Sequence, residues 1–183
     1  MVKLNIGCGK EVKEGFEGID ILDFGQKHIV DIRKGIPYKN EVIDEIYTRY
    51  LLPVLTNLNG KLERVKFFNE MYRVLKPNGI VTLIVPCWNA NGGYGNPLFH
   101  EPVYEGFLFF LSKEWRELNA PEVTQYICDF EPTWGYNLHP NLINRNQEFQ
   151  QFALANYCNA ALDLIITLKK KGRLNETPKR GRK

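Results

Sequence analysis

The sequence predicts an α/β fold built on a mostly parallel sheet. Residues 2–6 alternate between apolar and polar side chains and end in Gly7-Cys8-Gly9, a pattern typical of a strand that enters a nucleotide-binding turn. A helix with one apolar face is expected between Asn59-Gly60 and Lys76-Pro77-Asn78-Gly79. Residues 80–85 then form a continuous apolar run, which predicts a central strand covered on both faces.

Length and composition indicate one globular domain. The chain has 183 residues, of which 44% are hydrophobic and 25% charged, and this balance excludes a wholly disordered, collagen-like or coiled-coil protein. No apolar run approaches the roughly 18 residues needed to cross a bilayer. Because the first residues also lack the apolar stretch of a signal peptide, we expect a cytoplasmic protein.

Charge divides the chain into a body and a tail. We expect a single domain over residues 1–172 and a basic, disordered tail over residues 173–183. This tail could contact a nucleic acid or another polyanion, or it could serve only to keep the chain soluble. The cysteines lie far apart without zinc spacing, so reduced thiols and no metal site are expected at Cys8, Cys87, Cys128 and Cys158.

Acidic residues stand near the ends of the next two predicted strands. Residues 17–21 carry Asp20, and residues 28–32 carry Asp31. A carboxylate at the end of the second strand can accept two hydrogen bonds from ribose hydroxyls. Only ten residues separate Gly9 from Asp20, so the first crossover must be abbreviated. A fourth strand is predicted at residues 42–48.

The second half combines a loop with further helices and strands. Residues 89–97 are rich in glycine and follow the fifth strand, at the edge where open α/β sheets bind ligands. We therefore interpret residues 86–111 as a substrate lid, although a plain surface loop would look the same. An amphipathic helix is predicted over 103–118, strands over 123–130 and 162–170, and a helix over 149–157 between them.

Four motifs in order resemble class I S-adenosylmethionine-dependent methyltransferases, most closely the compact type 11 branch. They are Leu4-Asn5-Ile6-Gly7-Cys8-Gly9, then Gly18-Ile19-Asp20-Ile21, then Ile43-Asp44-Glu45-Ile46-Tyr47, and last residues 70–81, a helix ending in RVLKPNG before an apolar strand. The resemblance covers residues 1–86 by motif. It implies a Rossmann-like, mostly parallel seven-stranded sheet of order 3-2-1-4-5-7-6, with helices on both faces.

The same resemblance implies an activity and a cofactor site. The activity is transfer of a methyl group from S-adenosylmethionine to an O or N nucleophile. In this reading Gly7 and Gly9 approach the methionine part of the cofactor, Asp20 binds the ribose hydroxyls, and Asp31 lies near the adenine. The full set of implied cofactor residues is Asn5, Gly7, Cys8, Gly9, Asp20, Ile21, Asp31, Ile32, Thr48 and Arg49.

The chain departs from the family where relatives contact their substrates. Many relatives read SHVLEH after the fourth strand, whereas this chain reads RYLLPV over residues 49–54, so the usual His and Glu are absent. The family's third glycine is also replaced, by Glu11. We name His100 and Tyr50 as catalytic candidates, because relatives often place a histidine in the lid and an imidazole titrates near pH 6.5.

Other interpretations stay open at this point. Asp31 could simply cap a short loop, Tyr50 could belong to the core, and His100 could bind backbone only. The protein could be a non-catalytic relative that binds a cofactor or another protein. A nicotinamide-dependent oxidoreductase is disfavoured, because Val12 breaks the GxGxxG fingerprint and the first crossover is short.

Overall fold

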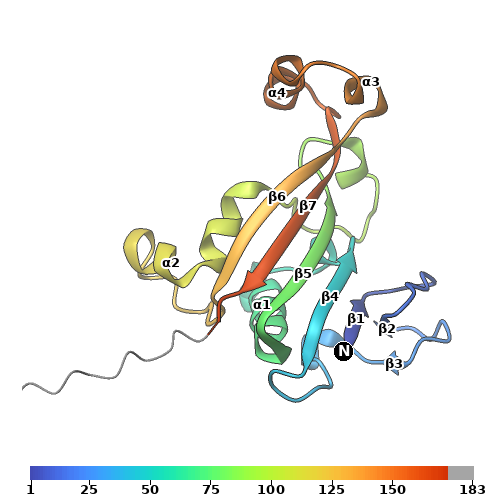
Figure 1. Cartoon of the computed structure of the whole chain (residues 1–183), viewed down its shortest axis with the longest axis vertical. Helices are drawn as coiled ribbons and strands as arrows, with labels where there is room; N and C mark the ends of the chain where they lie inside the picture. The colour runs from blue at the N-terminus through green and yellow to red at the C-terminus, as the bar shows by residue number, and fades with distance from the viewer. Residues whose placement is uncertain (173–183) are drawn as a thin grey trace, which may run out of the picture.

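A computed structural model describes residues 1–172, and their strands form one seven-stranded sheet in the order β3-β2-β1-β4-β5-β7-β6 (Figure 1). The first five strands run parallel, and β7 is antiparallel to both β5 and β6. The predicted strand order is therefore confirmed. The strands are β1 (Lys3–Ile6), β2 (Glu17–Asp20), β3 (His28–Ile29), β4 (Ile43–Arg49), β5 (Leu75–Pro86), β6 (Phe130–Leu138) and β7 (Ala161–Lys170).

Four α-helices and five short 3-10 helices connect these strands within residues 1–172. The α-helices are α1 (Glu63–Val74), α2 (Lys113–Asn119), α3 (Pro140–Ile143) and α4 (Gln147–Asn156). The 3-10 helices are η1 (Ile32–Lys34), η2 (Leu52–Val54), η3 (Leu58–Gly60), η4 (Asn91–Gly93) and η5 (Glu105–Leu111). None of the described helices is long and apolar enough to pass through a membrane. The basic tail predicted over 173–183 lies outside the described residues.

The helices that cover the sheet lie on one face. Helix α1 contacts η1 and β5, and Phe68 of α1 meets Phe107 of η5 with 5.7 Å between ring centroids. The connections from β1 to β2 and from β2 to β3 contain no helix. The abbreviated first crossover is thus confirmed, and it corrects the expectation of helices on both faces. Helices α3 and α4 lie beyond the end of the β6–β7 hairpin (Figure 1).

The buried core lies on the face of the sheet that the helices cover. Alternate residues of β5 and β7 point toward α1 and are buried, whereas Ile80 on the opposite face is 42% exposed. The prediction that residues 80–85 are covered on both faces is therefore wrong, because the short crossovers supply no helix for the second face. The buried residues that meet between β5, β7 and α1 are Phe67, Phe68, Met71, Val81, Leu83, Val85, Leu164, Ile166 and Leu168.

The segment predicted as a strand over 123–130 is irregular, and β6 starts only at Phe130. Side chains take the bonds that a neighbouring strand would supply. The Asn69 Oδ1 accepts from the backbone N–H groups of Ile127 (2.9 Å) and Cys128 (3.2 Å). Arg116 donates to the carbonyl of Cys128 at 2.8 Å. The alternating pattern there reflects burial of single side chains, without strand pairing.

Two other predicted elements have different bounds. The helix predicted over 103–118 is divided into η5 and α2, because Ser112 between them has an extended backbone with ψ of 123°. The strand predicted over 28–32 is short, because Asp31 ends it and caps η1 through a hydrogen bond from the Arg33 N–H. Helix α4 and strand β7 lie where residues 149–157 and 162–170 predicted them.

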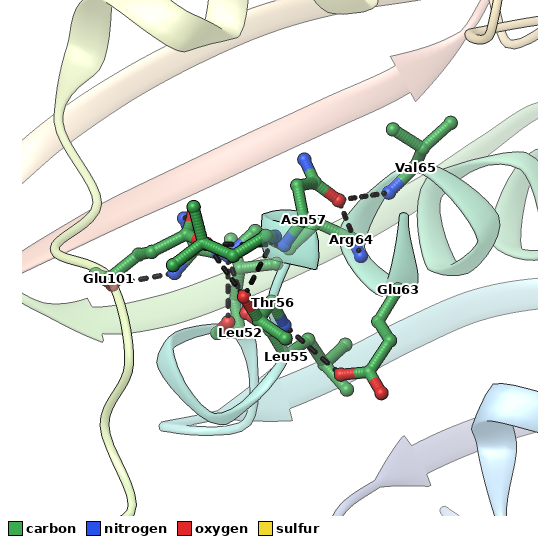
Figure 2. A network of polar contacts seen from close by, with 9 residues as sticks. Leu52, Leu55, Thr56, Asn57, Glu63, Arg64, Val65 and Glu101 are labelled. Atoms are coloured by element: carbon green, nitrogen blue, oxygen red, sulfur yellow. Dashed lines mark hydrogen bonds and ion pairs between the residues drawn. The ribbon is translucent and has the colours of Figure 1, made fainter. Parts of the chain in front are cut away.

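A buried arginine fixes the loops around the ends of the strands (Figure 2). Arg64 of α1 is 9% exposed and donates to the carbonyl groups of Leu52 (3.2 Å) and Leu55 (2.8 Å). It also donates to the carbonyl of Glu101 at 2.5 Å and forms an ion pair with its carboxylate at 3.2 Å. The segment after β4 and the chain that enters η5 are thereby held against the start of α1.

Candidate functional site

A hollow opens at the carboxyl ends of the first three strands. Backbone and side chains from the turns after β1, β2 and β3 form one wall, and the segment after β4 forms the other. We call it the β1–β3 hollow. Its lining residues are Gly7, Asp20, Ile21, Val30, Asp31, Ile32, Arg33, Leu51, Val54 and Leu55. Five of the ten residues implied as cofactor contacts therefore meet in one place: Gly7, Asp20, Ile21, Asp31 and Ile32.

Gly7 is required by the shape of the turn that borders this hollow. Its backbone has φ of +68°, in the left-handed region that favours glycine. A Cβ atom at this position would lie 3.1 Å from the side chain of Leu51, which is closer than ordinary contact. Its N–H donates to the carbonyl of Ile19 at 2.8 Å, so the turn is tied to β2. The absence of a side chain at Gly7 therefore leaves room for Leu51, which packs against the turn.

The Asp20 carboxylate connects the turn after β1 with the turn after β2, at the β1–β3 hollow. One carboxylate oxygen accepts from the Gly9 N–H at 2.8 Å, and the other accepts from the Leu22 N–H at 3.0 Å. A carboxylate offers about four lone-pair positions, so each oxygen can accept one more hydrogen bond. The side chain is therefore held in place and can still bind two neighbouring hydroxyl groups.

Asp31 belongs to an ion pair at the edge of the same hollow. The Arg33 guanidinium donates to both carboxylate oxygens, from Nε at 2.8 Å and from Nη2 at 3.0 Å. These hydrogen bonds hold the pKa of Asp31 below its ordinary value. Asp31 thus both caps a short helix and lines the hollow, so the two readings of this residue are compatible.

The structure has a second hollow, which we call the β4–β7 hollow. It lies between the turn after β4, the end of β5, the glycine-rich loop and the start of β7. Its lining residues are Tyr50, Pro86, Ala90, Asn91, Gly92, Gly95, Asn96, Phe99, Asn159, Leu162 and Asp163. Tyr50 lines this hollow and the next residue, Leu51, lines the first, so the segment after β4 borders both hollows. The loop interpreted as a lid forms one wall.

Tyr50 is the polar centre of the β4–β7 hollow. Its backbone has φ of +57°, and its hydroxyl donates to Asp163 Oδ1 at 2.6 Å. The Arg49 guanidinium lies over its ring, 4.7 Å from the centroid. Burial, together with the bond to Asp163, raises the pKa of Tyr50 above its ordinary value, so at neutral pH the hydroxyl remains a hydrogen-bond donor.

Solved structures share this architecture. A SAM-dependent methyltransferase from Archaeoglobus fulgidus is 16% identical with a TM-score of 0.63, over 92% of this chain and 85% of its own. A SAM-dependent methyltransferase from Methanosarcina mazei is 17% identical with a TM-score of 0.53, over 92% of each chain. The [4+2]-cyclase SpnF is 16% identical with a TM-score of 0.54, over 93% of this chain and 75% of its own.

The chain has the class I methyltransferase fold. In comparisons of sequence, no family model and no curated protein matched it. The methyltransferase fold thus rests on architecture, with strand order and turn geometry as its evidence. It agrees with the resemblance that the motifs over residues 1–86 predicted.

The other implied cofactor residues lie apart from the β1–β3 hollow of this methyltransferase fold. Asn5, Cys8 and Gly9 line a separate hollow, beside the connection from β1 to β2. Burial, followed by the charge of Asp20, raises the pKa of the Cys8 thiol. Thr48 is buried, and its hydroxyl oxygen has no hydrogen-bond partner among the described residues. Arg49 is exposed above the ring of Tyr50.

The two catalytic candidates have different surroundings. Tyr50 lines the β4–β7 hollow, as described. His100 is exposed, its backbone N–H donates to the carbonyl of Pro53 at 2.9 Å, and it lines neither of these two hollows. Residues 1–172 also contain no group of His, Cys, Asp or Glu that could hold a metal ion.

Several lining residues were missed by sequence reasoning. The apolar wall of the β1–β3 hollow comes from Val30, Leu51 and Leu55, which look like any core residues in the sequence. Asp163 was missed as well, although it interrupts the apolar run ALDLIITL of β7. A carboxylate in a buried strand is unusual, and that signal could have found it.

Proposed function

We propose that this protein is an S-adenosylmethionine-dependent methyltransferase that transfers a methyl group to an O or N nucleophile. The observation that carries the proposal is the Asp20 carboxylate, held by two backbone N–H groups at the end of β2 and facing a hollow with apolar walls. Such a carboxylate suits a ribose diol, and the apolar walls suit a purine ring.

The residues of the β1–β3 hollow fit this cofactor. Asp20 would bind the ribose hydroxyls, Ile21 and Ile32 would flank the adenine, and Asp31 would lie near the adenine amine. The turn at Gly7, with Leu51 packed against it, would lie beside the methionine part. When bound, the cofactor supplies a methyl group already activated by a positively charged sulfur.

The chain's own task is then to orient the acceptor. The β4–β7 hollow and the cofactor site share the segment after β4, at Tyr50 and Leu51, so a molecule held there would be close to the cofactor. Alignment of two reactants is by itself a large source of rate acceleration. No strong catalytic dyad is required, which is compatible with the loss of the family's His and Glu from residues 49–54.

Calorimetric titration with S-adenosylhomocysteine tests the cofactor site. Asp20→Asn keeps an oxygen acceptor for the turn and removes the charge, so we expect affinity to fall by about ten-fold or more. Asp23→Asn is the matched control, because Asp23, in the loop that follows β2, also accepts from a backbone N–H, that of Gly25, but does not line the hollow. No binding by the wild-type protein, or equal affinity in both variants, would contradict the proposal.

A non-catalytic cofactor-binding or protein-binding module is the second candidate. The altered segment over residues 49–54 favours it, because the family's usual His and Glu are absent there. A cofactor-binding module predicts binding of S-adenosylhomocysteine that depends on Asp20, without transfer of a labelled methyl group to any O or N acceptor in a screen. A protein-binding module predicts neither binding of S-adenosylhomocysteine nor methyl transfer.

A further inference from the structure

Asp163 is a buried carboxylate with only neutral partners. It is 7% exposed, in the interior of β7. The Tyr50 hydroxyl donates to one oxygen at 2.6 Å, and the Asn137 side-chain amide donates to the other at 2.9 Å. Within residues 1–172 it forms no ion pair. A buried carboxylate is costly unless a cation or several donors compensate it, so Asp163 is incompletely compensated.

The β4–β7 hollow gives Asp163 access to a ligand. Asp163 is the sole charged residue among those that line it, and the remaining lining consists of apolar, aromatic, glycine and asparagine residues. Each carboxylate oxygen has used one lone-pair position and retains another. A carboxylate accepts hydrogen bonds and donates none, so the ligand group that meets it must be a donor. A positively charged donor gains most, because the surroundings are desolvated.

We propose that the β4–β7 hollow binds an ammonium group carried on a small hydrocarbon or aromatic body, with Asp163 as its counterion. This inference rests on the proposed function, because it makes an amine the methyl acceptor and places it beside the cofactor site. The bound ammonium group would have to release one proton to water before its nitrogen had a lone pair with which to accept a methyl group. Pro86, Phe99 and Leu162 would contact the hydrocarbon part. The asparagine side chains of the loop and of the turn before β7 would bind further polar groups of the ligand.

Arg49 is a cation in contact with Tyr50, and its position agrees with the proposal. It contacts the ring and hydroxyl of Tyr50, with 3.5 Å between Nη2 and the hydroxyl oxygen, and it does not line the hollow. The hydroxyl of Tyr50 thus stands between Arg49 and Asp163. Arg49 interacts with Asp163 through space but forms no direct ion pair with it, so an ammonium group in the hollow would supply the ion pair that Asp163 lacks within residues 1–172.

Three probes of similar shape test the inference by calorimetry at pH 7: benzylamine as the cation, benzyl alcohol as the neutral analogue and benzoate as the anion. We expect wild-type protein to bind benzylamine about ten-fold more tightly than benzyl alcohol, and benzoate most weakly. Asp163→Asn should remove this preference. Glu131→Gln, an exposed position on the neighbouring strand β6, should retain it.

Two further variants separate ligand binding from a purely structural role of Asp163. Tyr50→Phe frees one carboxylate oxygen, so the preference for benzylamine should be kept or increased. Gly92→Phe should abolish binding of every probe while leaving Asp163 in place, because a Cβ atom at Gly92 meets nothing within 4 Å and the added ring would occupy the hollow. If Asp163 only ties β6 and β7 to the turn after β4, Asp163→Asn lowers the melting temperature and leaves the preference for the cation unchanged, which overturns the inference.

Titration of the same preparations with S-adenosylhomocysteine separates the two proposals. Binding of S-adenosylhomocysteine without any preference among the three probes overturns the ammonium site and leaves the cofactor site standing. A preference for benzylamine in a protein that does not bind S-adenosylhomocysteine overturns the proposed function and supports the ammonium site.

Discussion

Arg64 shows how one buried charge organises the surroundings of a site. Its guanidinium bonds to the carbonyls of Leu52, Leu55 and Glu101, which belong to the two segments that reach the ends of the strands. Burial lowers the pKa of Arg64, which is the cost of placing a cation there, while the carboxylate of Glu101 opposes that shift. Because the three carbonyls are satisfied by one side chain, the two segments depend on it together.

Arg64→Met should therefore be strongly destabilising. The variant removes a buried cation and leaves three carbonyls and the Glu101 carboxylate short of a donor, so we expect the free energy of unfolding to fall by about 3 kcal/mol. Urea denaturation measures this change. Lys113→Met is the control, because Lys113 forms an exposed ion pair with Glu117 at 3.6 Å and should cost within about 0.5 kcal/mol. Equal stability of the two variants would show that the carbonyls find other donors.

The sequence predicted the site residues at positions where the local backbone or its hydrogen bonds require one residue type. Gly7 and Asp20 follow from a strand, a turn with positive φ and a second strand, all within 20 residues. Asp163 could not be predicted in the same way, because its role depends on a hydrogen bond from Tyr50, which is 113 residues away along the chain. His100 was named from the habits of relatives, and the structure gives it no position in either hollow.

At the scale of elements, hydrogen-bond partners decide what periodicity alone cannot. Residues 123–129 alternate like a strand, but the Asn69 side chain of α1 and the Arg116 side chain of α2 satisfy part of their backbone. The strand that does form, β6, contains Pro132 and Gly135 and reads poorly as a strand. Its place at the edge of the sheet explains this, because an edge strand tolerates a residue without an N–H group.

Asn69→Ala tests the role of this side chain. Asn69 accepts from two backbone N–H groups and donates to the carbonyl of Gln125 at 2.9 Å, so its removal leaves three backbone groups without a protein partner. We expect a loss of about 2 kcal/mol in the free energy of unfolding, with faster amide hydrogen exchange at Ile127 and Cys128. Asn119→Ala in exposed α2, where the side chain bonds only the carbonyl of Trp115, should change exchange at neither amide.

The larger elements were predictable because their patterns are long or strongly apolar. Helix α1 and strand β7 lie close to their expected bounds, and the abbreviated first crossover follows from simple residue counting. Strand β5 contains the predicted run 80–85 but already begins at Leu75, so the segment predicted only as the stop of the helix belongs to the strand. The absence of a helix over the second face of the sheet was not predicted from the sequence, although the same short crossover causes it. A ten-residue connection can return the chain to a parallel strand, but it cannot supply a helix that also shields the sheet.

At the scale of the whole molecule, one large core connects the two ends of the described chain, with a small second cluster at Cys87, Ala90 and Ala161. The cluster of buried side chains extends from Leu4 and Ile6 of β1 to Leu168 of β7, through the face of the sheet that α1 covers. A continuous core of this kind favours unfolding as one unit, so damage at one edge of the sheet should be felt at the other.

The tryptophan residues make this cooperativity measurable. The chain has three of them, Trp88, Trp115 and Trp134, all after strand β5, whereas Ile6 is fully buried near the opposite edge of the sheet. Ile6→Ala should lower the free energy of unfolding by about 3 kcal/mol. We expect tryptophan fluorescence and far-ultraviolet circular dichroism to shift by the same amount in urea, although no tryptophan lies near the change.

Val12→Ala is the control, because Val12 is 95% exposed and its truncation should move neither signal. A fluorescence transition that stays at its wild-type midpoint while the circular dichroism shifts would divide residues 1–172 into two independently unfolding parts. In that case the β1–β3 hollow and the β4–β7 hollow would belong to different units, and binding at one would not stabilise the other. Coincident transitions instead imply that a ligand in either hollow stabilises the whole sheet, because the folded state is shared.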